Sequence, residues 1–154
     1  MKKILVSECL YGGRMVRYDG GDKHEEDPVF LKWKQEGRLI PVCPEVFGGL
    51  TVPRTDSQRR GDRVLMRDGR DVTAEYKAGA EEARRLAQLH DVAFCIMKES
   101  SPACGSSTIY DGSFSGRKIP GQGVSTEYLV NAGFRVFSEK ELKEAAAYLE
   151  SCEG

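Results

Sequence analysis

The sequence lacks most of the short motifs that would assign a common function. Its 154 residues contain only two histidines, and no two cysteines are spaced as Cys-x-x-Cys. The absence of this spacing disfavours a structural zinc site of the paired-cysteine type. Neither a P-loop nor a Gly-x-Gly-x-x-Gly fingerprint follows the first expected strand, so a nucleotide cofactor is disfavoured as well.

Long apolar runs and a strong charge of either sign are also missing. No stretch is long enough to span a bilayer. The formal net charge is −1, so the whole-chain charge favours neither a nucleic-acid nor a membrane partner. Residues 1–6 are basic and then apolar, but the apolar run is too short for a signal peptide and Glu8 interrupts it. We therefore expect a first strand there, and a cytoplasmic protein.

Strand-like and helix-like segments alternate along the chain. Short apolar segments predict strands at residues 3–7, 38–42, 92–97 and 134–137. Periodicity and capping residues predict helices at residues 28–36, 72–90, 125–131 and from Ser138-Glu141 to about residue 150. Helical crossovers between strands indicate a parallel sheet. The expected fold class is α/β: residues 1–154 form a single domain with a Rossmann-like three-layer fold, a mostly parallel sheet and helices on both faces.

One further element is expected outside this alternation. Residues 62–71 contain a short apolar run and the turn sequence Asp68-Gly69. This combination predicts a small β-hairpin.

Three of the five cysteines follow expected strands. Cys9 comes after the first strand, Cys43 after the second and Cys104 after the third. Because the carboxyl ends of parallel strands meet at the edge of the sheet that binds ligands, we expect these thiols to converge. Cys95 lies inside a strand and is interpreted as a small buried hydrophobe. Cys152, near the end of the sequence, is interpreted as an exposed bystander.

Convergent thiols of this kind suggest a metal centre with one open coordination position. An odd number of cysteines without a secretory signal disfavours a disulfide framework. An iron–sulfur cluster is favoured, because soft thiolates suit it and three ligands leave one iron open. Zinc held by three cysteines and a water stays open as an alternative. Without any metal, the three side chains would be small buried hydrophobes.

Two polar residues stand close to these cysteines in the sequence. Glu45 is two residues beyond Cys43, where a carboxylate can move a proton near a metal-bound ligand. Ser101 is three residues before Cys104, and its hydroxyl can both donate and accept a hydrogen bond. The alternatives are a solvated loop glutamate and a turn- or helix-capping serine.

A series of ordered blocks runs along nearly the whole chain. They include Cys9-Leu10, Arg17-Tyr18-Asp19-Gly20, Cys43-Pro44-Glu45, Gly48-Gly49-Leu50, Pro53-Arg54, Ser101-Pro102, Cys104-Gly105 and Ile109-Tyr110-Asp111-Gly112. Together these blocks resemble the thiouracil desulfurase (desulfidase) family, which was first catalogued as a domain of unknown function. One departure concerns Gln58, which stands where the family usually has an acidic residue, and it could alter substrate choice.

The resemblance implies a specific cofactor and reaction. It implies a [4Fe-4S] cluster held by Cys9, Cys43 and Cys104, with Glu45 as the catalytic acidic residue and Ser101 as the catalytic serine. The implied activity is a non-redox desulfidase that converts the thiocarbonyl of a thiouracil-like pyrimidine to a carbonyl and releases hydrosulfide. The implied partner is a small thiolated base or nucleoside.

Two other functions stay open. The same cluster chemistry could act on thiolated tRNA, although the near-neutral charge and the lack of a basic stripe argue against it. The chain could also be a non-catalytic metal-binding or redox-sensing protein that uses the three cysteines. Glu45 and Ser101 beside the thiols favour catalysis over that reading.

Overall fold

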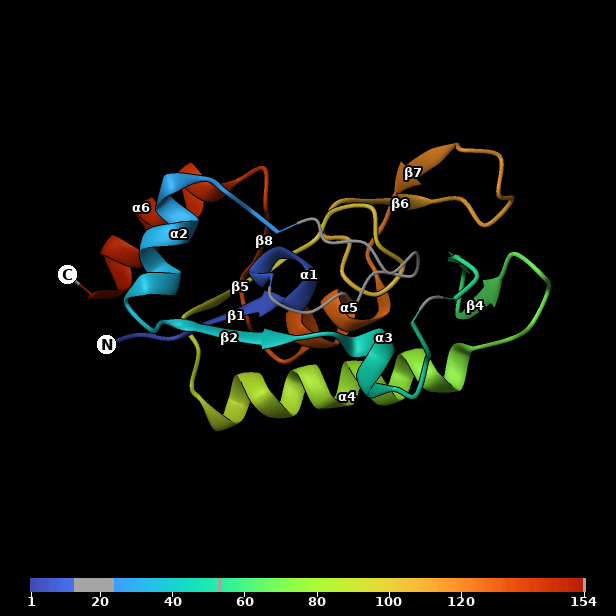
Figure 1. Ribbon diagram of the computed structural model, residues 1–154, viewed down its shortest axis with the longest axis horizontal. Coiled ribbons are helices and arrows are strands. Elements are labelled where there is room, and N and C mark those ends of the chain that lie inside the picture. The colour runs from blue at the N-terminus through green and yellow to red at the C-terminus, as the bar shows by residue number, and fades with distance from the viewer. Residues whose placement is uncertain (13–23, 53, 154) are drawn as a thin grey trace.

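A four-stranded parallel sheet runs through the middle of the protein (Figure 1). The computed structural model describes residues 1–12, 24–52 and 54–153. The sheet has the strand order β2-β1-β5-β8. Its strands are β1 (Ile4–Ser7), β2 (Leu39–Val42), β5 (Phe94–Met97) and β8 (Val136–Ser138). The expected α/β fold with a parallel sheet is confirmed, and all four expected strands are present. The block Arg17-Tyr18-Asp19-Gly20 and Pro53 lie outside the described residues.

Helices connect the strands and also follow two of them directly. They are α1 (Glu8–Tyr11), α2 (Pro28–Gln35), α3 (Pro44–Phe47), α4 (Thr73–Leu89), α5 (Val124–Asn131) and α6 (Leu142–Glu153). The side chain of Asp27 caps α2 by accepting a hydrogen bond from the backbone N–H of Val29 at 2.8 Å. The short helices α1 and α3 were expected as loops, because four residues are too few to show a helical period.

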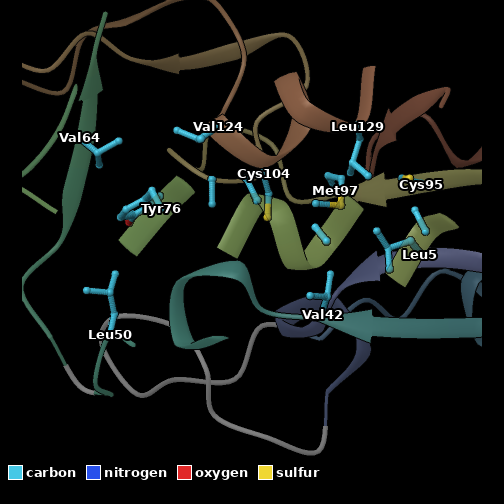
Figure 2. Close-up of a cluster of buried hydrophobic side chains, with 14 of the residues drawn as sticks. Leu5, Val42, Leu50, Val64, Tyr76, Cys95, Met97, Cys104, Val124 and Leu129 are labelled. Carbon is cyan, nitrogen blue, oxygen red and sulfur yellow. The ribbon is translucent and has the colours of Figure 1, made fainter. Parts of the chain in front are cut away.

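Hydrophobic cores lie on both faces of the sheet. Successive side chains of a strand point to opposite faces, so Ile4 belongs to the core under α2 and α6, whereas Leu5 belongs to the core over α4 and α5. Figure 1 shows α2 and α6 together on one side of the sheet and α4 along the other. Cys95 is fully buried in the second core, near Leu5 and Met97 (Figure 2). This burial agrees with its interpretation as a small hydrophobe.

Two antiparallel hairpins complete the described part of the fold. They are β3 (Ser57–Arg60) with β4 (Arg63–Met66), and β6 (Thr108–Tyr110) with β7 (Lys118–Pro120). The small hairpin expected at residues 62–71 is present, because Leu65 and Asp71 form an antiparallel bridge around the turn at Asp68-Gly69. The additional pairing of β4 with β3 was not expected. The polar sequence of β3 gave no alternating strand signal. Among the described residues, no helix is long and apolar enough to cross a membrane.

The topology brings several chain segments to one end of the sheet. After β1 the chain crosses over to β2 on one side, and after β2 it returns to β5 on the other. Parallel sheets bind ligands at the carboxyl ends of strands where the order switches in this way. Figure 1 shows β2 running toward α3, with both hairpins at the same end of the molecule.

Candidate active site

Three thiols line one cavity at this carboxyl edge. Cys9 lies on α1 directly after β1, Cys43 directly after β2, and Cys104 in the loop that follows β5. The cavity has a volume of about 490 Å³, which is within the usual range for small-molecule sites. Glu45 and Ser101 line the same cavity, whereas Cys95 and Cys152 do not. The five residues singled out from the sequence therefore lie in one place.

Short helical turns hold the first two thiols at the strand ends. In α1, Leu10 is buried in the core below α2 and fixes the turn that carries Cys9. Cys43 is the N-cap residue of α3, and its carbonyl accepts a hydrogen bond from the N–H of Phe47 at 2.9 Å. Each thiol thus leaves its strand on a rigid turn.

The third thiol is fixed through contacts with α5. The carbonyl of Cys104 accepts a hydrogen bond from the hydroxyl of Thr126 at 2.8 Å. The N–H of Ser125 donates to the carbonyl of Ala103 at 2.9 Å. A Cβ on Gly123 would lie 2.3 Å from the carbonyl carbon of Ala103. Only glycine therefore permits this close approach between the start of α5 and the cysteine loop.

Burial and mutual repulsion oppose ionisation of the thiols. Burial, with the charges of Cys43 and Glu45, raises the pKa of Cys9 to about 12. Burial and Glu45 raise the pKa of Cys43 to about 11. Burial raises the pKa of Cys104 well above its usual value, and Ser7 opposes this rise. Thiolates gather in such a place only beside a strong positive centre, which is the chemistry of a metal-binding donor set.

The three thiols are a donor set that suits an iron–sulfur cluster. Soft thiolates are the usual ligands of such clusters, and three of them leave one iron open. Cys9, Cys43 and Cys104 line one cavity, so the residues present fit the cofactor that the resemblance implies.

The carboxylate of Glu45 contacts two neighbouring side chains. Oε2 of Glu45 accepts a hydrogen bond from the hydroxyl of Tyr76, and Oε1 lies 3.4 Å from the guanidinium of Arg54. The Arg54 side chain is 3% exposed and that of Glu45 is 19% exposed. Burial, then the charge of Glu45, raise the pKa of Tyr76 well above its usual value, so the phenol stays protonated and donates. These contacts fix the carboxylate beside the thiols.

A close backbone contact sets the position of α3. A Cβ on Gly79 of α4 would lie 1.9 Å from the carbonyl oxygen of Pro44, and a Cβ on Gly48 would lie 2.0 Å from the carbonyl oxygen of Glu75. Two glycines thus let the backbones of α3 and α4 touch. Helix α3, which carries Glu45, therefore packs directly against α4.

Ser101 caps the loop that carries the third thiol. Its Oγ accepts hydrogen bonds from the N–H groups of Ala103 and Cys104, both at 3.1 Å. The capping alternative considered for this serine is therefore present in the structure. Since both bonds use the oxygen as an acceptor, the hydroxyl proton is left for donation, and Ser101 also lines the cavity.

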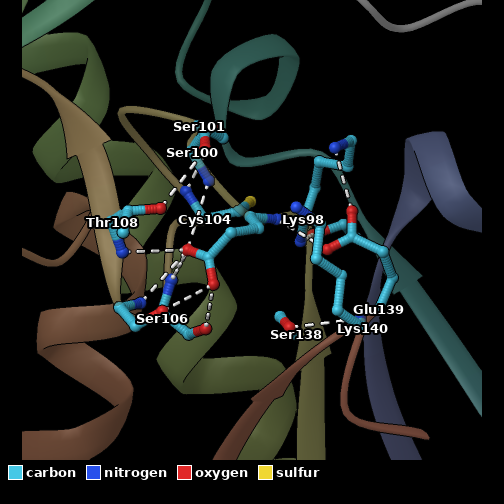
Figure 3. Close-up of polar contacts among 12 residues, drawn as sticks. Lys98, Ser100, Ser101, Cys104, Ser106, Thr108, Ser138, Glu139 and Lys140 are labelled. Atoms are coloured by element: carbon cyan, nitrogen blue, oxygen red, sulfur yellow. Dashed lines mark hydrogen bonds and ion pairs between the residues drawn. The ribbon is translucent and has the colours of Figure 1, made fainter. Parts of the chain in front are cut away.

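Glu99 organises this loop and was missed by the sequence analysis. Its carboxylate accepts six hydrogen bonds, from four backbone N–H groups and two hydroxyls. The donors are Ser100, Ser106, Ser107 and Thr108. Figure 3 shows Ser106 and Thr108 in this network, next to Ser101 and Cys104. Burial raises the pKa of Glu99, but these hydrogen bonds outweigh it and lower the pKa to about 2.

Charged side chains surround the remaining wall of the cavity. Lys98 pairs with Glu139 at 2.9 Å, and Arg67 pairs with Asp56 at 2.9 Å. Lys118 and Lys140 also line the cavity. The only sequence signal for these residues is their position after strands and in polar loops, which does not separate them from solvated surface residues.

Comparisons with known proteins show the family of this chain. The family model described as "2-thiouracil desulfurase" matches residues 4–141. The uncharacterized protein YbbK of Bacillus subtilis (strain 168) is 38% identical over 151 residues, which are 92% of this chain and 98% of YbbK. A solved structure of the [4Fe-4S]-dependent thiouracil desulfidase TudS is 43% identical, with a TM-score of 0.94 over 97% of this chain and 99% of that chain. The chain belongs to the 2-thiouracil desulfurase family.

Proposed function

We propose that this protein is a [4Fe-4S]-dependent desulfidase that acts on a thiolated pyrimidine. The reaction replaces the thiocarbonyl sulfur by the oxygen of water, so that C=S and H₂O give C=O and H₂S. No electrons are gained or lost, so no external electron donor is needed. One observation carries the proposal: three thiols, one carboxylate and one hydroxyl line a single cavity of about 490 Å³.

Cys9, Cys43 and Cys104 would hold the cluster. When bound, the cluster supplies a Lewis-acidic iron with an open position for the sulfur of the substrate. None of the three forms a disulfide among the described residues, and their common cavity leaves room for a small molecule beside them. The cysteines bind the cofactor and take no part in proton transfer.

Glu45 acts as the general base. Tyr76 and Arg54 hold its two oxygens from behind, so the carboxylate is presented to the cavity in one orientation. It accepts a proton from the water that attacks the thiocarbonyl carbon, and it returns that proton to the departing sulfur. A carboxylate fixed beforehand needs little reorganisation during the reaction.

Ser101 moves the second proton. Its oxygen is fixed by the N–H groups of Ala103 and Cys104, which leaves the hydroxyl hydrogen as the group it donates. The same two hydrogen bonds hold Ser101 and the third thiol in a fixed relation. The serine therefore combines a capping role with proton donation.

The proposal extends to the partner, the compartment and the architecture. A cavity of this size suits a free base or nucleoside better than tRNA. Five cysteines that form no disulfide among the described residues suit the reducing cytoplasm. We also infer that residues 1–154 form one domain with Rossmann-like three-layer architecture, because the cores on both faces share the same sheet.

Anaerobic reconstitution with iron and sulfide, followed by incubation with 2-thiouracil or 4-thiouracil, tests this function. The reconstituted protein should be brown and should release one sulfide for each uracil formed. Cys9→Ala, Cys43→Ala and Cys104→Ala should lose both the colour and the activity. Cys152→Ala is the matched control, because Cys152 lies outside the cavity, and it should keep both. A colourless zinc protein without sulfide release would support the non-catalytic alternative.

A further inference from the structure

Tyr110 is the one aromatic side chain among the described residues that line the cavity. It belongs to the sequence block Ile109-Tyr110-Asp111-Gly112, to which the proposed function gives no role. The other described residues of the cavity wall offer no aromatic face. A thiolated pyrimidine is a flat heteroaromatic ring, and such rings bind well against another aromatic face. Tyr110 is therefore the candidate for contact with the plane of the substrate.

The alternation of strand β6 turns Tyr110 toward the cavity. Neighbouring residues of a strand point to opposite faces, so Thr108 and Tyr110 share one face and Ile109 lies on the other. Ile109 is buried, and a Cβ on Gly121 would lie 3.0 Å from its Cδ1. Oγ1 of Thr108 lies 3.4 Å from Oγ of Ser100, which lines the cavity. The face of β6 that carries Tyr110 is thus the cavity face.

Two buried side chains anchor β6 on either side of Tyr110. The carboxylate of Glu99 accepts a hydrogen bond from the N–H of Thr108 at 3.1 Å. The amide oxygen of Gln58 accepts one from the N–H of Gly112 at 3.0 Å. Both Glu99 and Gln58 are buried. Because the chain is fixed before and after it, Tyr110 is in place before any ligand arrives.

Lys118 covers one face of the Tyr110 ring. It stands opposite Tyr110 in the antiparallel pair of β6 and β7, and its Nζ lies 5.4 Å from the centroid of the ring. Such a cation–π contact helps to fix the ring plane. No aromatic pair among the described residues includes Tyr110. A neighbouring ring therefore does not occupy its second face within this part of the chain.

We propose that Tyr110 determines specificity by stacking on the ring of the substrate, so that the site selects aromatic thiocarbonyl compounds over saturated ones. This inference rests on the proposed desulfidase function. The sulfur and the attacked carbon both lie in the plane of a thiolated pyrimidine. A contact across that plane restricts how the ring can tilt, and it thereby orients the thiocarbonyl group in the cavity. The aromatic ring of Tyr110 supplies this contact, and its hydroxyl is not needed for it.

The saturated analogue 5,6-dihydro-2-thiouracil tests the inference. It keeps the thiocarbonyl and keto groups, but its ring is neither flat nor aromatic. In Tyr110→Leu, the ratio of kcat/KM for 2-thiouracil to that for the analogue should fall about fivefold to a hundredfold below the wild-type ratio, as is usual when an aromatic partner of a base is removed. The ratio is the readout, because a merely structural defect would lower both values alike. An unchanged ratio overturns the inference.

Two matched variants serve as controls. Tyr110→Phe keeps the ring and removes only the hydroxyl, so its ratio should equal that of the wild type. Phe47→Leu removes an exposed aromatic side chain that does not line the cavity, and its ratio should also be unchanged. If the ratio falls as far in Tyr110→Phe as in Tyr110→Leu, the preference depends on the hydroxyl and stacking is overturned. An equal fall in Phe47→Leu overturns it as well, since the effect would then not depend on the cavity.

Binding of product separates this inference from the proposed function. Equilibrium dialysis of the wild-type holoprotein with uracil and with 5,6-dihydrouracil needs no turnover, and it serves even if Tyr110→Leu fails to fold. Uracil should bind at least about fivefold more tightly than its saturated analogue. Equal binding overturns the role of Tyr110, and binding of neither compound overturns both proposals. Selective uracil binding without sulfide release from either thiouracil overturns the desulfidase function alone.

Discussion

The hydroxyl of Tyr76 donates a hydrogen bond to Oε2 of Glu45 across 31 residues of sequence. Tyr76 is fully buried on α4, and Glu45 faces the cavity from α3. The long helix thus supplies the candidate base with a fixed neutral donor. Every movement of the carboxylate toward the substrate is limited by this contact and by Arg54 on the other oxygen.

Tyr76→Phe should therefore lower kcat without loss of the cluster. The substitution removes one hydrogen bond to a charged acceptor, which is worth about 1.5–3 kcal/mol, so kcat should fall about tenfold to a hundredfold. Steady-state kinetics and the visible absorption spectrum of the holoprotein measure the two effects. Tyr128→Phe on α5 is the control and should leave both unchanged, since Tyr128 does not line the cavity. Loss of colour in Tyr76→Phe would show that the contact supports the cluster instead.

Ser101 offers a way to separate capping from proton donation. Ser101→Ala removes the acceptor for the N–H groups of Ala103 and Cys104, so both cluster content and kcat should fall. Ser101→Asn restores a capping acceptor but no hydroxyl. This variant should regain iron while kcat stays about a hundredfold or more below the wild type, as for a lost general acid. Recovery of full activity in Ser101→Asn would show that Ser101 acts only as a cap and donates no proton.

Glu99 should make the free energy of unfolding depend on pH in the acidic range. Its pKa is lowered to about 2 in the folded protein, so its contribution is present above the unfolded value near 4.5 and is lost as the pH falls toward 2. Urea unfolding at pH 7 should show Glu99→Gln destabilised by up to about 3 kcal/mol. The difference from the wild type should shrink between pH 4.5 and 2. Glu150→Gln, at an exposed position on α6, is the control and should show no such trend.

Gly79→Ala should destabilise the protein although alanine favours helices. A Cβ at this position would lie 1.9 Å from the carbonyl oxygen of Pro44, so α3 must shift. Overpacking of this kind costs about 1–3 kcal/mol, and displacement of Cys43 should also lower the iron content. Thermal unfolding and iron analysis measure the two losses. Lys77→Ala, exposed on the same helix, should change neither.

The sequence predicts the sheet and the gathering of the thiols because both depend on local patterns. Short apolar segments mark the strands, and the parallel topology alone brings Cys9, Cys43 and Cys104 to one edge. The polar strand β3 and the pair β6–β7 carry no such pattern, so their pairing emerges only in three dimensions.

Residues that act through distant partners could not be predicted either. Tyr76 fits the apolar face of α4, and nothing local indicates that its hydroxyl reaches α3. Glu99 resembles any loop glutamate, because its six donors depend on the folded shape of the loop. Gln58 stands out in the sequence as a departure from the family, but its two backbone partners are known only from the fold.

The glycine contact between α3 and α4 has an evolutionary consequence. Because Cys43 caps the four-residue helix that carries Glu45, and this helix is pressed against α4, neither residue can be repositioned without the other. New substrate preferences are therefore easier to reach by mutating the two hairpins that also line the cavity. Divergent members of this family should differ first there, while the wall that carries the thiol and the carboxylate stays the same.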